Sequence, residues 1–396
     1  MLTATTIMQL AEQGRLELDE PAARYVPWLS EHRDRRVPLV TIRQLLWHGA
    51  GLVRDGLDAK HWTLKAPFPN QAGLKNIVLA VDLAIDSGQK LKYSNLGYAI
   101  LGQVIEAASE LSCADYMQQN IFDRLGLRTG VPNYRPHIKP RIVTGYSRPY
   151  DHERQAMAIG VPTSTFDAVA GCYFTAGELC EFLAAHLPGD RRLLSEKSKR
   201  QMRSTKNHRG PLSTAGCTSY GLGFIESRFG GQRAFGHNGG FLGHRCCAYF
   251  DPERRLVVTV LTNATDAPVQ EMVEGIFGVF DYFGHWNQLP PPPERARLNG
   301  RLVSMSTTLE LVATRDRIAV IYPDDWLPFD MIIEELQPVA PNIYKIMRAH
   351  DLASDAEPVA FNFDKRGRIR RVNYAGSLMV HERLYSREPA NKKALL

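Results

Sequence analysis

The sequence lacks the signatures of several other classes of protein. It has six cysteines in 396 residues and no Cys-x-x-Cys spacing, which argues against a disulfide framework and against the usual zinc-site patterns. No apolar run approaches the length of a membrane span. There is no His-Glu-x-x-His pair of metal ligands and no Gly-x-Ser-x-Gly nucleophile elbow. The sequence therefore predicts no metal, no cofactor and no membrane-spanning segment.

Charge of either sign is also modest. The formal net charge is +6, and the hydrophobic fraction of 44% and charged fraction of 23% are those of an ordinary globular protein. The densest basic run is residues 365–371 (KRGRIRR), which alternates with apolar positions around Gly367. We interpret this run as a solvated β-hairpin, so we expect no nucleic-acid partner.

A run of four prolines divides the chain. Residues 289–294 (LPPPPE) can lie in neither a helix nor a sheet interior, so they predict a stiff spacer. After it, strands are predicted at residues 317–322, 343–347, 358–363 and 369–374. We therefore expect a large domain over 1–288, a proline-rich linker over 289–293 and a small antiparallel β-domain over 294–396.

The large region mixes helices and strands. The patterns predict helices over residues 1–13, from Thr41, over 96–108, from Thr175 to about 186, and over 267–283. Thr175 and Glu178 have the spacing of a capping box. Two strands, 244–250 and 255–261, are predicted around a turn at 251–254.

Two short motifs carry the chemistry. Residues 92–98 (KYSNLGY) place Tyr93 two positions before Asn95, and residues 236–240 (GHNGG) place His237 before Gly239 and Gly240. The unperturbed pKa of a phenol is about 10, so Tyr93 becomes a base at neutral pH only where nearby cations favour the phenolate. Asn95 shares the side of Tyr93 only in an extended or loop conformation, where its amide can both donate and accept. The glycines let a strand approach a ligand without a Cβ clash.

Together these motifs resemble the penicillin-binding-protein and class C β-lactamase superfamily of serine hydrolases. Its three elements are Ser-x-x-Lys, Tyr-x-Asn, and Lys-Thr-Gly or His-x-Gly. Three further stretches occur in the order of that family: 41–52 (TIRQLLWHGAGL), 169–179 (VAGCYFTAGEL) and, as a strand, 220–224 (YGLGF). The resemblance covers roughly residues 1–285. It implies an α/β (α+β) fold, in which an antiparallel sheet is flanked by helices with an all-helical subdomain.

The resemblance also implies a role for each motif residue. Tyr93, with the family's Lys, would shuttle the proton of the nucleophile, while Asn95 and His237 would orient the substrate. The N–H of Gly240, on the strand with Gly239, would stabilise the oxyanion, which is typically worth about 100- to 1000-fold in rate. In the other stretches, we interpret His48 as structural and Cys172 as a small substituted residue rather than a thiol nucleophile.

The serine nucleophile is missing from this pattern. Ser87-Gly88-Gln89-Lys90 is a literal Ser-x-x-Lys, but Gly88 predicts a turn, in which Ser87 and Lys90 do not share a helix face. By contrast, residues 2–10 (LTATTIMQL) and 12–21 (EQGRLELDEP) resemble the segment that follows the family's nucleophile. In that register the Lys falls immediately before Met1 and the Ser three residues earlier. We therefore expect Met1 to be an internal methionine, and the chain as given to be inactive.

The predicted activity of the intact protein is hydrolysis of an ester or amide through an acyl-enzyme. A neutral His237 offers less positive charge than a Lys to the carboxylate of a β-lactam or peptide. The sequence therefore favours a small-molecule ester, amide or D-amino-acid peptide as substrate, and an esterase, amidase or D-amino-acid peptidase over a true β-lactamase.

Two alternatives stay open at this point. The first is a catalytically inactive β-lactamase-like binding or scaffold protein. The second is a carbohydrate- or peptide-binding protein whose function lies in the 294–396 β-domain. Reduced cysteines suit the cytoplasm, whereas the resemblance implies that export is common, so the sequence leaves the compartment open, as it does the oligomeric state.

Overall fold

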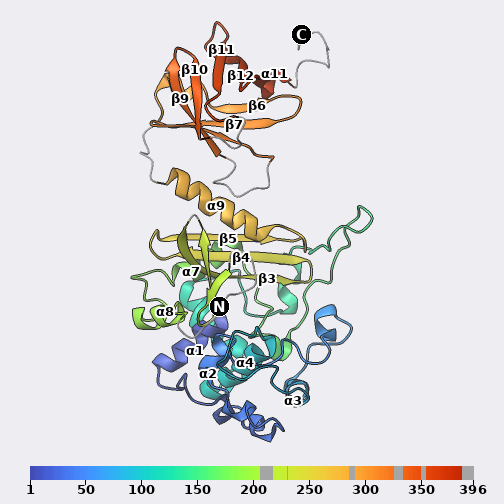
Figure 1. The fold of residues 1–396 in the computed structure, drawn as a ribbon. Coiled ribbons are helices and arrows are strands. Elements are labelled where there is room, and N and C mark those ends of the chain that lie inside the picture. The colour runs from blue at the N-terminus through green and yellow to red at the C-terminus, as the bar shows by residue number, and fades with distance from the viewer. Residues whose placement is uncertain (206–216, 230, 285–289, 325–332, 349–353, 386–396) are drawn as a thin grey trace. The chain divides into compact units, whose positions relative to one another are not determined.

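The computed structural model describes residues 1–205, 217–229, 231–284, 290–324, 333–348 and 354–385. The chain forms two compact units, residues 1–273 and residues 274–396 (Figure 1). The division falls inside helix α9 (Val269–Phe283). Pro293, the last of the four prolines, begins helix α10 (Pro293–Ala296), where the missing N–H of a proline costs no hydrogen bond. Leu289 lies outside the described residues, so the linker over 289–293 stays a prediction.

A five-stranded antiparallel sheet forms the frame of the first unit. Its strands lie in chain order: β1 (Cys217–Tyr220), β2 (Ile225–Phe229), β3 (Gln232–Phe241), β4 (His244–Asp251) and β5 (Leu256–Thr262). The two strands predicted around 251–254 are confirmed as β4 and β5. Asp251 builds the turn between them, because its carboxylate accepts the N–H groups of Glu253 at 2.7 Å and Arg254 at 3.0 Å.

The strand predicted over residues 220–224 is wrong. Tyr220 is the last residue of β1, and residues 221–224 turn the chain into β2. Gly223 has a φ of +81°, and a Cβ there would lie 2.3 Å from that of Ala4. The glycines of this stretch therefore serve a turn that approaches another element closely, rather than a strand.

Helices cover the sheet and form a helical region beside it. They are α1 (Leu2–Glu12), α2 (Ile42–Leu46), α3 (Gln71–Leu79), α4 (Asn95–Ser109), α5 (Cys113–Met117), α6 (Asp123–Leu125), α7 (Ala176–Ala184) and α8 (Glu196–Met202). The predicted helices are confirmed, and α2 and α7 each begin with a complete capping box, at Thr41 and Thr175.

The two faces of the sheet are covered by different helices. From α7, the thiol of Cys180 lies 3.2 Å from the hydroxyl of Thr259 on β5. On the opposite face, the thiol of Cys247 on β4 donates to Gln270 at the start of α9. Helix α1 is buried along most of its length and packs on α4, which brings the first residues of both helices close to β3.

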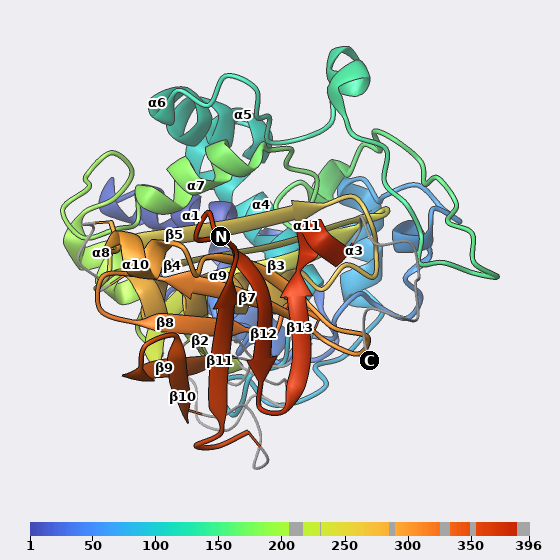
Figure 2. The same ribbon diagram turned by 90° about the horizontal axis from the view of Figure 1, so that it is seen from above.

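The second unit contains a closed antiparallel barrel. Its eight strands are β6 (Gly300–Val303), β7 (Thr308–Ala313), β8 (Ile318–Ile321), β9 (Ile333–Ala340), β10 (Ile343–Arg348), β11 (Pro358–Phe363), β12 (Ile369–Tyr374) and β13 (Ser377–His381). Figure 2 shows β11, β12 and β13 side by side. A short helix, α11 (Glu382–Tyr385), follows. The antiparallel β-region predicted from the sequence is confirmed, and pairing of β13 with β6 and of β9 with β10 closes it.

Among the described residues, the mostly apolar barrel interior contains a buried carboxylate, that of Glu334. Glu334 is fully buried, and it accepts the hydroxyl groups of Tyr322 at 3.0 Å, Ser354 at 2.8 Å and Tyr374. These donors compensate for the loss of water around a buried charge. The charge and the burial raise the pKa of Tyr374, because its phenolate would face both a low dielectric and a neighbouring anion.

The cap of α7 gives a direct stability test. The hydroxyl of Thr175 accepts the N–H of Glu178 at 3.2 Å, and the Glu178 carboxylate accepts the N–H of Thr175 in return. We expect Thr175→Ala to lower the free energy of unfolding of the first unit by about 1 kcal/mol, the usual value of a lost N-cap. Thr175→Ser is the matched control, and it should retain most of the stability that the cap contributes. Equal losses in both variants, measured by urea unfolding, would contradict the role of the cap.

Candidate active site

Strand β3 offers an open edge beside α1 and α4. It pairs with β2 only over residues 232–236, whereas it pairs with β4 over residues 235–241. Residues 237–241 therefore run past the end of β2, and no strand in the described part of the chain pairs with them on that side. His237 and Gly239 lie opposite Ala248 and Cys246 of β4. Among the described residues, the backbone groups of this segment on that side are therefore not used in sheet pairing.

Tyr93 and His237 approach this edge from different elements. Tyr93 lies just before α4, and its ring centroid is 6.2 Å from that of His237 on β3. The sequence places His237 ahead of a strand pair, but in the structure it lies within β3 itself. The two motifs therefore meet in space although 144 positions separate Tyr93 from His237 (237 − 93).

His48 lies against the Tyr93 ring, with 4.1 Å between the two centroids. It is buried, with 3% of its surface exposed, and its backbone is left-handed, with a φ of +57°. A non-glycine residue adopts this conformation only where its surroundings hold it. Here the Nδ1 of His48 accepts the N–H of Ser94 at 3.1 Å, and its Nε2 lies 3.2 Å from the hydroxyl of Tyr220. The interpretation of His48 as structural agrees with these contacts, which place it directly behind Tyr93.

Asn95 is fixed by a carboxylate. It is the first residue of α4 rather than part of a loop, and Ser94 before it is the extended N-cap. The Asn95 amide nitrogen donates to Asp55 at 2.7 Å, and the indole N–H of Trp62 donates to the same oxygen at 2.7 Å. Arg54 pairs with the other oxygen of Asp55 at 3.2 Å. Because a carboxylate only accepts, Asp55 holds the nitrogen of Asn95 and leaves its oxygen for another partner.

The two glycines differ in what they permit. A Cβ at position 239 would lie 3.0 Å from the sulfur of Cys246, so Gly239 is needed for close packing on β4. At position 240 a Cβ would meet only ordinary contacts, the nearest at 3.7 Å, and Gly240 is exposed. The space above Gly240 is therefore open, which leaves its backbone accessible to a ligand.

Met1, the residue just before α1, lies among these groups. The backbone nitrogen of Met1 is buried and close enough to the thiols of Cys172 and Cys246 to interact with them electrostatically. It also influences the pKa values of His48 and His237. A residue joined to the nitrogen of Met1 would therefore enter the space beside β3.

Burial keeps the site electrically neutral. It lowers the pKa of His237 to about 4 and that of His48 well below its usual value. It raises the pKa of Tyr93, although Arg54, whose guanidinium lies 5.8 Å above the ring, acts in the opposite direction. At neutral pH both imidazoles and the phenol are therefore uncharged. Arg54 therefore does not offset the effect of burial on the Tyr93 phenol.

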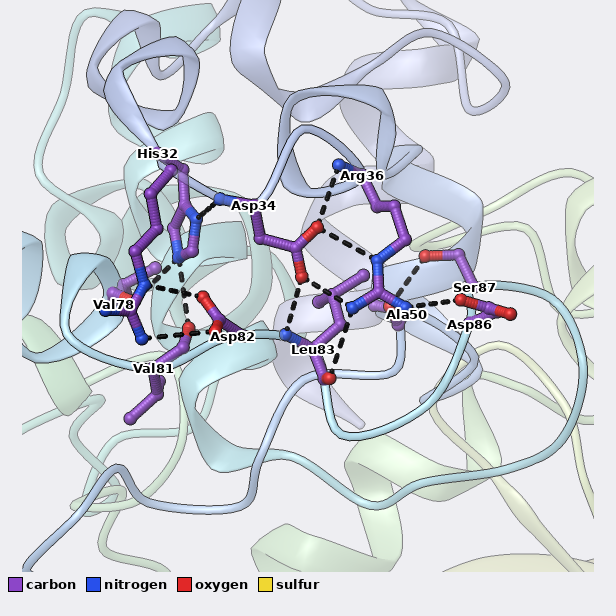
Figure 3. Close-up of polar contacts among 11 residues, drawn as sticks. His32, Asp34, Arg36, Ala50, Val78, Val81, Asp82, Leu83, Asp86 and Ser87 are labelled. Atoms are coloured by element: carbon purple, nitrogen blue, oxygen red, sulfur yellow. Dashed lines mark hydrogen bonds and ion pairs between the residues drawn. The ribbon is translucent and has the colours of Figure 1, made fainter.

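The literal Ser-x-x-Lys lies elsewhere. Ser87 is in a turn and donates its hydroxyl to the carbonyl of Ala50 at 2.7 Å. Figure 3 shows it beside Asp86, which pairs with Arg36 in a surface network of charged groups. Lys90 is exposed, and no hydrogen bond among the described residues joins it to Ser87. This arrangement agrees with the rejection of Ser87 as the nucleophile.

Cys172 also lacks the properties of a nucleophile. Its thiol donates to the carbonyl of Pro132 at 3.2 Å, and burial raises its pKa to about 12. The thiolate, which is the reactive form, is therefore scarce at neutral pH.

Within the described ranges, no three His, Cys, Asp or Glu side chains come close enough together to hold a metal ion. Among the helices that the structure describes, none is both long and apolar enough to span a bilayer.

Sequence reasoning did not identify three residues that complete the site. Asp55 lies in an irregular loop after residues 41–52, Trp62 lies in the 3-10 helix Lys60–Thr63 that follows, and the sequence marks Tyr220 only as part of a strand motif. Their partners lie 40 positions away for Asp55 with Asn95, and 172 for Tyr220 with His48. A local pattern carries no signal for such contacts.

The sequence is similar to those of known proteins. A family described as "Beta-lactamase" matches residues 1–277. "Penicillin-binding protein 4" of Amycolatopsis lactamdurans is 27% identical over 289 residues, which cover 66% of this chain and 69% of that protein.

Solved structures show the same fold. A D-stereospecific amidohydrolase from Streptomyces sp. matches with a TM-score of 0.62 and 23% identity, covering 72% of this chain and 84% of that one. The octameric penicillin-binding protein homologue from Pyrococcus abyssi matches with a TM-score of 0.59 and 19% identity, covering 96% and 86%. At these identities the likeness concerns the fold.

The hydrogen bonds that Asp55 accepts from Asn95 and Trp62 can be tested in the chain of residues 1–396. We expect Asp55→Ala to lower the free energy of unfolding by about 1–3 kcal/mol, because the buried amide of Asn95 and the half-buried indole of Trp62 lose their acceptor. The indole N–H resonance of Trp62 should shift in NMR spectra. Trp28, which donates to Gln103 at 2.9 Å, is the internal control and should not move.

Asp55→Asn is the matched variant. It keeps an acceptor oxygen for Asn95 and Trp62, so its loss of stability should be smaller than that of Asp55→Ala. A Trp62 resonance unchanged in both variants would show that Asp55 does not hold this cluster.

Proposed function

The chain belongs to the β-lactamase family, and on that premise we propose that it forms the Tyr93, Asn95 and His237 part of a serine-hydrolase site. The reaction is cleavage of an ester or amide through an acyl-enzyme. The observation that carries this proposal is the meeting of Tyr93 and His237 at the open edge of β3, near the nitrogen of Met1.

The proposed roles follow from the position of each group. Tyr93 passes the proton between the serine hydroxyl and the leaving group, together with the family's Lys. Asn95 offers its free oxygen to an amine or amide N–H. The N–H of Gly240, on the exposed segment of β3, stabilises the oxyanion that forms when the carbonyl is attacked.

The nucleophile is proposed to act from the helical turn that would precede Met1. A Ser-x-x-Lys joined there extends α1 by about one turn, which places serine and lysine on one face. Burial lowers the pKa of the amine on Met1 to about 6. The same desolvation would favour a neutral lysine, which can accept the proton of the serine.

The neutral site indicates the kind of substrate. His237 has no positive charge at neutral pH, because burial holds its pKa at about 4, so it offers no fixed cation to a carboxylate. We therefore propose an ester, an amide or a D-amino-acid peptide as substrate, rather than a β-lactam recognised by its carboxylate. The name of the Streptomyces D-stereospecific amidohydrolase, whose fold this chain shares, agrees with this substrate class.

A second candidate is a catalytically inactive binding or scaffold protein. Ser94 lies between Tyr93 and Asn95. Its hydroxyl accepts the N–H of Gly97 at 3.0 Å, which caps α4, and donates to the carbonyl of Val53 at 2.8 Å. It is therefore not free to act as a nucleophile, and the chain of residues 1–396 by itself fits this second candidate.

Labelling with a fluorophosphonate separates the two candidates. Two extended chains are compared, one with Ser-Ala-Thr-Lys before Met1 and one with Ala-Ala-Thr-Lys. We expect the serine-extended chain to gain one covalent adduct by intact mass, and the alanine-extended chain and the 1–396 chain to gain none. Tyr93→Phe in the serine-extended chain should slow labelling by about 100- to 10,000-fold, the usual contribution of a general base.

Circular dichroism establishes that each chain is folded. A folded serine-extended chain that gains no adduct would contradict the hydrolase proposal and favour the binding protein. Equal labelling of the serine- and alanine-extended chains would show that another residue reacts.

A further inference from the structure

We propose that His48 and Tyr220 are positioning residues that hold His237 in a single tautomer. Through His237 they brace the Gly239–Gly240 segment of β3 against the Tyr93–Asn95 turn. The proposal rests on the proposed function only for its catalytic consequence, because the brace itself is built from residues of this chain.

The brace is a continuous chain of hydrogen bonds. The N–H of Ser94 lies 3.1 Å from the Nδ1 of His48, and the Nε2 of His48 lies 3.2 Å from the Tyr220 hydroxyl. The same hydroxyl lies 3.1 Å from the Nε2 of His237, whose Nδ1 contacts the carbonyl of Asn238. Four contacts thus connect the N-cap of α4 to the strand that carries the two glycines.

The backbone groups at the two ends of this series of hydrogen bonds, on Ser94 and Asn238, fix the direction of each bond within it. A backbone N–H can only donate, so the Nδ1 of His48 accepts from Ser94 and its Nε2 carries the proton. A carbonyl can only accept, so the Nδ1 of His237 carries the proton and donates to Asn238. The Nε2 of His237 is then an acceptor. Tyr220 accepts from His48 and donates to His237, which satisfies both imidazoles at once.

Burial makes this arrangement costly to disturb. Only 3% of His48 and 4% of Tyr220 is exposed, so a lost bond is not replaced by water. Tyr98 also hydrogen bonds with Tyr220 while its own hydroxyl donates to the carbonyl of Leu46 at 2.8 Å. Tyr98 could therefore compete with His237 for the Tyr220 proton. The Asn238 carbonyl keeps the proton of His237 on Nδ1, so the Nε2 of His237 stays an acceptor for the Tyr220 hydroxyl.

The arrangement changes the role expected of His237. Both of its ring nitrogens are engaged within the chain, so its imidazole is not available to contact a substrate while the brace is intact. His237 instead orients the peptide that joins Asn238 to Gly239. It thereby sets the direction of the Gly240 N–H towards the first turn of α1. His48 connects this strand to the turn of Tyr93, so one brace fixes the relative position of the two motifs.

The test is the tautomer of each imidazole, measured by long-range ¹H–¹⁵N NMR on the 1–396 chain at neutral pH. We expect the pyridine-type nitrogen to be Nε2 in His237 and Nδ1 in His48. In Tyr220→Phe, His237 should become a mixture of both tautomers, because its Nε2 loses its donor. His48 should keep its tautomer, which Ser94 fixes.

Tyr249→Phe is the matched control. Tyr249 is equally buried, and its hydroxyl lies 3.4 Å from that of Ser227 on β2, so this variant loses a buried hydroxyl of the same sheet without touching the brace. It should leave both tautomers unchanged. A His237 with its proton on Nε2 in the unmodified chain would overturn the proposal, and so would an unchanged His237 in a folded Tyr220→Phe variant.

The catalytic consequence is measured separately, in the serine-extended chain. Tyr220→Phe should slow fluorophosphonate labelling by up to about 100-fold, the cost of misplacing a reacting group by about 1 Å, and Tyr249→Phe should not. If the tautomers are as expected but the serine-extended chain is never labelled, the brace stands and the proposed hydrolase function fails. If labelling occurs but His237 carries its proton on Nε2, the proposed hydrolase function stands and the brace fails.

Discussion

Burial governs this site, because a hydrogen-bonding group removed from water must find its partner within the chain. The groups at the head of α1 and α4 satisfy this requirement in two clusters. In one, Asp55 accepts from Asn95 and Trp62. In the other, Tyr220 connects His48 to His237. Each cluster joins elements far apart in sequence, so satisfying the buried polar groups also fixes the geometry between the motifs.

The same burial determines the electrostatics. Imidazoles and phenols are kept neutral because desolvation disfavours their charged forms, and this holds for His48, His237 and Tyr93. A neutral Tyr93 is a poor base. In the proposed site a lysine joined to the nitrogen of Met1 would favour the phenolate, and that nitrogen is itself buried.

Sequence reasoning succeeds where the determining interactions are local. The capping boxes at Thr41 and Thr175, the turn at Asp251 and the strand pattern of the barrel all depend on residues within a few positions of one another. It fails at residues 220–224, where Gly223 is required by the approach of Ala4 rather than by a strand. The closure of the barrel depends on the pairing of β13 with β6, which no local pattern indicates.

The candidate site divides in the same way. Tyr93, Asn95, His237, Gly239 and Gly240 are marked by short motifs, and the structure brings the two motifs together at β3. Asp55, Trp62 and Tyr220 are visible only once the chain is folded, because their roles are contacts rather than patterns. The proposed positioning role of His237 likewise depends on the partners of its two ring nitrogens, which only the folded structure shows.

The central claim is that the open edge of β3 and the first turn of α1 form one reaction centre. A crystal structure of the serine-extended chain after reaction with a fluorophosphonate tests it most directly. We expect phosphorus bonded to the added serine, with the phosphoryl oxygen about 2.7–3.1 Å from the nitrogen of Gly240. An adduct on another serine, or a phosphoryl oxygen directed away from β3, would contradict it.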